Sequence, residues 1–81
     1  MIPERTRESL VLYVEHRIQP GHFLTAVLEN DLFGAFNRAD DENTAAMRHI
    51  VAYVYNYLPS GCWGSPRKVS AWLTGVAEEV A

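Results

Sequence analysis

Residues 59–66, PSGCWGSP, contain the side chains most suited to chemistry in this chain, including its only cysteine, Cys62. A thiol close to the N-terminus of a helix can have a lowered pKa and act as a nucleophile. Such a nucleophile is usually paired with a histidine base. Nothing in the spacing of His16, His22 and His49 places one of them beside Cys62. We therefore expect no enzymatic activity and no catalytic residue.

The same stretch could also form an anion site. Ser65 precedes a proline, a pair typical of the first positions of a helix, where free N–H groups attract anions. Arg67 and Lys68 follow in the first turn, where positive charge opposes the helix dipole. An anion held by Trp63, Ser65, Arg67 and Lys68 would remove that conflict. The structural alternative is that Trp63 anchors the corner between two helices while Cys62 is a small buried hydrophobic residue.

Metal and cofactor binding are not expected. The acidic run RADDEN contains Asp40, Asp41, Glu42 and Asn43 in succession, whereas calcium loops place their ligands at alternate positions around a glycine turn. The histidines lack the short paired spacing of structural zinc ligands. The run instead predicts a helix N-cap at Asp40 or Asp41, with an acidic first turn that complements the helix dipole.

Tyr53, Tyr55 and Tyr57 are candidates for binding a partner protein. Residues two apart are separated by about 200° around a helix, so these three side chains cannot all face one core. At least one should reach the surface, where tyrosine is typical of protein–protein interfaces. The alternative is that they cover the rim of the core with their hydroxyl groups in water.

The spacing of apolar residues predicts four or five helices joined by short connections. The segments are residues 3–18, 22–30, 32–39, 40–58 and 65–81. Gln19-Pro20-Gly21 ends the first, Asn30-Asp31 separates the second from the third, and Gly34 weakens the third relative to alanine. The expected apolar stripes are Leu10, Val11, Val14 and Ile18; Phe23, Leu24, Val27 and Leu28; Leu32, Phe33 and Phe36; Met47, Ile50, Val51, Val54 and Leu58; and Val69, Trp72, Leu73, Val76 and Val80.

Composition supports one small soluble domain. The chain has 81 residues, of which 48% are hydrophobic and 21% charged, and a net charge of -3. An excess of acidic residues disfavours general nucleic-acid binding. No segment has the length of apolar sequence needed for a membrane span, and the N-terminus does not resemble a signal peptide. A single cysteine fits a reducing compartment.

Three motifs carry a resemblance to a known group of proteins. Residues 23–32 fit FLxAVLxNDL, residues 38–43 fit RADxxN, and residues 55–72 fit YNxxPxGCWGSPxxVxxW. On these motifs the chain resembles short uncharacterised proteins encoded by tailed bacteriophages and prophages. The resemblance implies a phage origin and the cytoplasm of the bacterial host, and it brings no established activity. Similar chains often have an acidic residue after GCWGSP, where this chain has Arg67.

We therefore expect residues 1–81 to form a single all-α domain, a compact bundle of four or five short helices. The expected function is a non-enzymatic protein–protein interaction module, a phage accessory protein that binds a host or phage protein, with a homodimer as one form. Modulation of a host defence or regulatory protein is one such role. The alternative is a module that binds a small anionic ligand or nucleotide at the helix N-terminus after GCWGSP.

Overall fold

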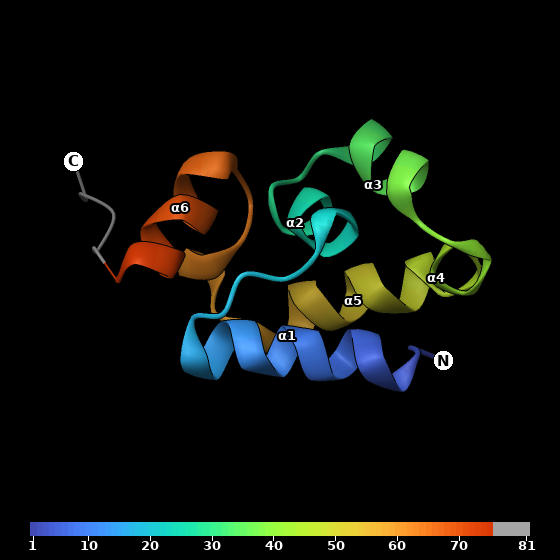
Figure 1. Cartoon of the computed structure of the whole chain (residues 1–81), viewed down its shortest axis with the longest axis horizontal. Coiled ribbons are helices and arrows are strands. Elements are labelled where there is room, and N and C mark those ends of the chain that lie inside the picture. The colour runs from blue at the N-terminus through green and yellow to red at the C-terminus, as the bar shows by residue number, and fades with distance from the viewer. Residues whose placement is uncertain (76–81) are drawn as a thin grey trace.

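The computed structural model describes residues 1–75, and every regular element within them is a helix. The elements are α1 (Glu4–His16), α2 (His22–Leu28), α3 (Leu32–Arg38), α4 (Asp41–Ala45), α5 (Met47–Tyr57), the 3-10 turn η1 (Ser60–Cys62) and α6 (Pro66–Thr74) (Figure 1). The Cα radius of gyration is 12.0 Å, close to the value of about 12 Å for a compact chain of this length. The predicted all-helical class is confirmed, although the described part contains six α-helices rather than four or five.

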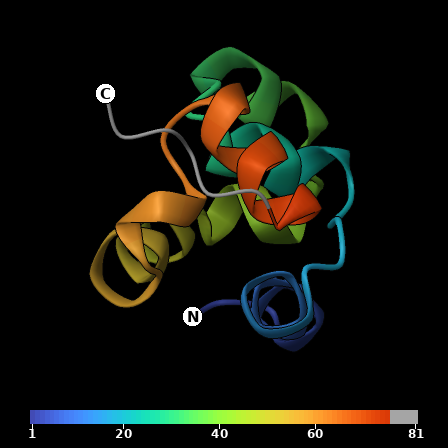
Figure 2. The ribbon, with the colours of Figure 1, turned by 90° about the vertical axis from the view of Figure 1, so that its left-hand side faces the viewer.

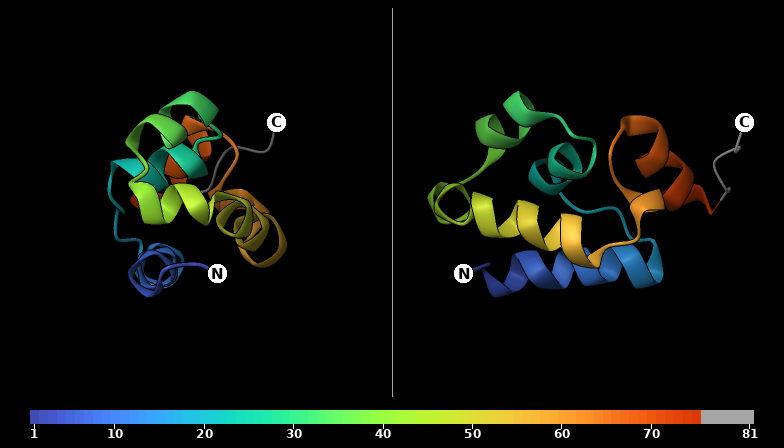
Figure 3. Two further views of the ribbon diagram at one scale, coloured as in Figure 1. Left: turned by 90° about the vertical axis from the view of Figure 1, so that its right-hand side faces the viewer. Right: turned by 180° about the vertical axis from the view of Figure 1, so that it is seen from behind.

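The helices surround one main core. α1 and α5 lie side by side and run in the same direction, with α2 and α3 on the other side of α5 and α6 at one end (Figures 1 and 3). Figure 2 looks along α1 and shows it on the opposite side of the molecule from α3. The buried members of the core are Leu10, Tyr13, Leu24, Leu28, Ala46, Ile50, Val54, Leu58, Cys62 and Val69. Within residues 1–75, no helix combines the length and the apolar character needed to cross a bilayer.

α1 buries Thr6, Leu10 and Tyr13, which lie on one face at helical spacing. The expected stripe was wrong at its last position, because the side chain of Ile18 is 50% exposed. The helix ends at His16, and Arg17 adopts a left-handed conformation (φ 58°), so Ile18 is already outside it.

The predicted helix over residues 40–58 is two helices. Asp40 caps the first, since its carboxylate accepts a hydrogen bond from the N–H of Asn43 at 2.8 Å. Ala46 leaves the helical conformation (φ −96°, ψ 3°), and its N–H is shared between the carbonyls of Glu42 and Asn43. The buried Asn43 side chain accepts a hydrogen bond from Thr6 at 2.7 Å, which holds α4 on α1. This bond joins residues far apart in the chain, so the local sequence pattern gives no sign of it.

Two further predicted helix starts are confirmed. Asp31 caps α3 through a hydrogen bond from the N–H of Gly34 at 3.0 Å, and Asn30 makes the preceding turn with φ 63°. A Cβ at Gly34 would lie 2.8 Å from the carboxyl carbon of Asp31, so any larger residue there would displace the capping carboxylate. Ser65 caps α6 by accepting the N–H of Lys68 at 3.2 Å.

α6 ends at Thr74, and Gly75 takes the left-handed conformation (φ 77°) common at helix ends. The helix is therefore shorter than predicted within the described residues. The expected stripe positions Val76 and Val80 lie outside residues 1–75.

Candidate functional site

Cys62 is a core residue. Its side chain is fully buried, and burial raises the pKa of its thiol to about 11. Its backbone carbonyl accepts a hydrogen bond from the hydroxyl of Tyr13 at 2.7 Å. Burial also raises the pKa of Tyr13, so both groups keep their protons at neutral pH. A buried, protonated thiol is a poor nucleophile, and its surroundings are those of a structural cysteine.

Trp63 has two roles at the corner before α6. It is half-buried and packs against the main core, and its indole N–H points to the carbonyl of Leu58 at 3.4 Å. Its ring also lies 5.8 Å from the ring of Tyr55. The backbone N–H of Gly64 donates to the carbonyl of Leu28 at 2.7 Å and ties the same corner to α2. Trp63 therefore supports the corner, as expected, and also contributes to the surface.

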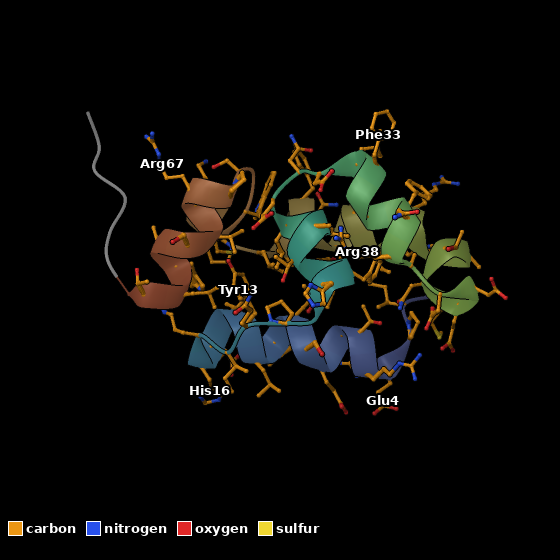
Figure 4. All side chains as sticks on the ribbon, turned by 45° about the horizontal axis from the view of Figure 1, so that its top comes forward. Glu4, Tyr13, His16, Phe33, Arg38 and Arg67 are labelled. Carbon is orange, nitrogen blue, oxygen red and sulfur yellow. The ribbon has the colours of Figure 1, made fainter. Side chains whose placement is uncertain are left out.

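The residues of the expected anion site make contacts within the chain. The Ser65 hydroxyl accepts the N–H of Lys68, and the Lys68 ammonium lies 3.4 Å from the carbonyl of Ser60. The side chain of Arg67 points outward from α6 (Figure 4). Ser65 therefore acts as a helix cap, and the positive charge of Lys68 is directed towards a backbone carbonyl.

The acidic run at the start of α4 has an electrostatic partner on α1. The Arg5 guanidinium lies 2.9 Å from the carboxylate of Asp40 and 3.6 Å from that of Glu42. These groups are exposed, so the pair contributes at most about 1 kcal/mol. Among residues 1–75, no three His, Cys, Asp or Glu side chains are grouped so as to hold a metal ion.

The three tyrosines of α5 lie on two faces of the molecule. Tyr53 is half-buried, and its ring lies 5.2 Å from that of Tyr57, beside α1. Tyr55 faces the opposite way, towards Trp63. Two of the three are strongly exposed, Tyr55 at 71% and Tyr57 at 75%, so the expectation that at least one reaches the surface is confirmed.

Tyr55 borders an apolar cavity between α3 and α5. The cavity has a volume of about 190 Å³, and Trp63 closes part of its wall. Its apolar lining residues are Val27, Leu32, Ala35, Phe36, Met47, Val51, Val54, Tyr55 and Trp63. A shallower hollow continues along α5 and shares four residues with it, namely Phe36, Met47, Val51 and Tyr55.

Four exposed apolar side chains that line this cavity, together with the neighbouring Phe33, form what we call the α3–α5 face. They are Leu32 (63% exposed), Phe33 (85%), Phe36 (47%), Val51 (50%) and Tyr55 (71%). Figure 4 shows Phe33 pointing away from the body of the molecule. Two charged residues line the hollowed region, Asp31 in the cavity and Arg48 in the shallower hollow.

Sequence reasoning placed four of these residues in core stripes. Val51 was assigned to the core face of α5, and Leu32, Phe33 and Phe36 to that of α3, whose only buried residue is Ala35. The angular argument used for the tyrosines also applies to α3. Leu32 and Phe33 are about 100° apart around the helix, so both cannot point into one narrow core.

Comparison with known proteins gives no relative for this chain: no protein-family model, no curated protein and no solved structure matches it.

Proposed function

We propose that this chain is a non-enzymatic protein–protein interaction module that binds its partner through the α3–α5 face. The observation that carries the proposal is a group of five large apolar side chains, each 47–85% exposed, of which four line one apolar cavity and the fifth, Phe33, follows the lining residue Leu32 on α3.

The size of the face supports this function. At about 200 Å² for each aromatic side chain, the exposed fractions of Phe33, Phe36 and Tyr55 amount to roughly 400 Å². Leu32 and Val51 raise the exposed apolar area to roughly 500 Å². That is near the upper end for the largest apolar patch of a monomeric protein, about 600 Å². Patches of this size and aromatic content are typical of interaction surfaces.

The partner follows from two separate considerations. The resemblance to short phage proteins supports a phage accessory protein that acts in the bacterial cytoplasm on a host or phage protein, such as a defence or regulatory protein. The surface itself supports a second copy of the chain. The anionic-ligand alternative has less support, because Ser65 and Lys68 already bond to backbone groups of their own chain.

A capture experiment with matched variants tests the function. The tagged chain is incubated with a bacterial lysate, and captured proteins are identified by mass spectrometry. Tyr55→Ala and Tyr57→Ala form the matched pair, since both side chains are exposed on α5 and each loses one aromatic neighbour. We expect a captured protein to be lost with Tyr55→Ala and retained with Tyr57→Ala. Equal capture by both variants, or capture of background alone by the wild-type chain, contradicts the use of this face for a heterologous partner.

A melting screen tests the alternative directly. Nucleotides and inorganic phosphate are added to the wild-type chain and to Arg67→Glu. If the α3–α5 face is the functional surface, melting temperatures stay flat across the screen. A rise in the wild-type chain that disappears in Arg67→Glu supports the anion site instead.

A further inference from the structure

We infer that the α3–α5 face binds a second copy of this chain, in a two-fold dimer where Phe33 of each copy enters the cavity of the other. The inference rests on the proposed function, because it assigns a partner to the same face. A two-fold interface uses the same surface on both copies, so that surface must present both a projection and a matching cavity.

Phe33 provides the projection. It is the most exposed aromatic residue of the face, at 85%, and it extends away from α3 (Figure 4). Leu32 and Phe36 flank the cavity on the same helix. Phe33 lies about 60° from Phe36 around α3. A second copy that covers Phe36 can therefore contact both the Phe33 side chain and the cavity.

The cavity has the size and chemistry to accept a phenyl ring. Its volume is about 190 Å³, and an apolar cavity of about 150 Å³ is known to bind benzene. Its walls are mainly aliphatic and aromatic, with Tyr55 and Trp63 on one side. These rings can pack against an entering phenylalanine in the tilted geometry that aromatic pairs prefer.

The charges of the cavity and of the shallower hollow are self-complementary. Asp31 lines the cavity, and Arg48 lines the shallower hollow that continues from it along α5. When two such surfaces meet in antiparallel directions, Asp31 of each copy faces Arg48 of the other. Complementary charges of this kind fix the register of an interface and disfavour other orientations.

The available area is sufficient for a specific dimer. The apolar side chains of two copies together contribute about 1,000 Å², the least that a specific interface usually buries. Polar neighbours such as Asn30 and Asn56, which line the same hollows, add to this area as the rim.

The test is the oligomeric state of the purified full chain, measured by sedimentation equilibrium from low to high micromolar concentration. We expect a reversible change from 9.2 kDa to twice that mass. Phe33→Ala should raise the dissociation constant at least about 30-fold, because two central aromatic anchors are lost for each dimer. Leu12→Ala is the control, since Leu12 is an exposed apolar residue of α1. It should leave the dissociation constant unchanged.

Charge variants test the orientation. Arg48→Glu places like charges opposite each other and should weaken the dimer about tenfold or more. Adding Asp31→Asn to Arg48→Glu should restore part of the loss, since asparagine still serves as an N-cap. Circular dichroism of each variant checks that the fold is retained.

The outcomes separate this inference from the proposed function. A monomer at every concentration, or a dimer that Phe33→Ala leaves intact, overturns the inference. If the chain is monomeric and still captures a protein in a Tyr55-dependent manner, the proposed function holds with a different partner. If it is monomeric and captures nothing, both proposals are wrong.

Discussion

Replacing Tyr13 by phenylalanine removes one hydroxyl group from the core and leaves the ring in place. That hydroxyl donates to the carbonyl of Cys62 at 2.7 Å, and both residues are fully buried. Without the donor, the carbonyl loses a hydrogen bond in a place that solvent does not reach, which costs about 1–3 kcal/mol. The contact between the rings of Tyr13 and Trp72, 6.5 Å apart, is unaffected. Stability should therefore fall through this one bond.

For a domain of this size, 1 kcal/mol corresponds to about 4–8 °C in melting temperature. We expect Tyr13→Phe to melt roughly 4–24 °C below the wild-type chain. Urea unfolding followed by tryptophan fluorescence and by circular dichroism measures the same loss independently. Tyr57→Phe is the matched control, because that side chain is 75% exposed, and a change within about 0.5 kcal/mol is expected. Protein concentration must be held constant, since the dimer proposed above would also raise stability. Equal stability of the two variants would refute the assigned role of the Tyr13 hydroxyl.

Three further predictions concern the same fold. Gly34→Ala should show no net stabilisation in urea unfolding, because the new methyl group displaces the capping carboxylate, and the loss of that cap, about 1 kcal/mol, offsets the similar gain that alanine brings to a helix. Gly61→Ala is the control, because a Cβ there meets nothing within 4 Å, and it should not destabilise the chain. Thr6→Val should cost about 1–2 kcal/mol by leaving the buried Asn43 amide without its donor, whereas Thr6→Ser should retain most of the stability. Burial raises the pKa of Cys62 from 9.0 to about 11, so the folded state keeps a proton that the unfolded chain loses. Stability should be complete below pH 9 and fall by up to about 3 kcal/mol as the pH rises to 11, and Cys62→Ala should reduce that slope.

The sequence predicted helix starts well, because they depend on local chemistry. Asp31, Asp40 and Ser65 each accept a hydrogen bond from the N–H three residues later, as expected for short polar side chains before a helix. The break at Ala46 was not predictable in this way. The bond between Thr6 and Asn43 that joins α4 to α1 spans 37 residues, and no local pattern reports it either.

The candidate site was predicted only in part. Tyr55 and Trp63 were selected from the sequence, but for different roles, and the structure places their rings 5.8 Å apart. Phe33 and Val51 were missed because an apolar residue at helical spacing was assumed to face the core. Which side of α3 is covered depends on its packing against α2 and α5, and this follows from the tertiary fold rather than from periodicity.

The position of Trp63 determines how far binding and folding can be separated in this chain. Phe33 and Tyr55 are mostly exposed, so truncating either removes little that the isolated fold uses. Trp63 packs against the main core and also forms the wall of the cavity. A substitution there changes both the corner before α6 and the surface that a partner would contact. Variants of Phe33 and Tyr55 can therefore report binding alone, whereas a loss of binding in a Trp63 variant would not distinguish a damaged interface from a damaged fold.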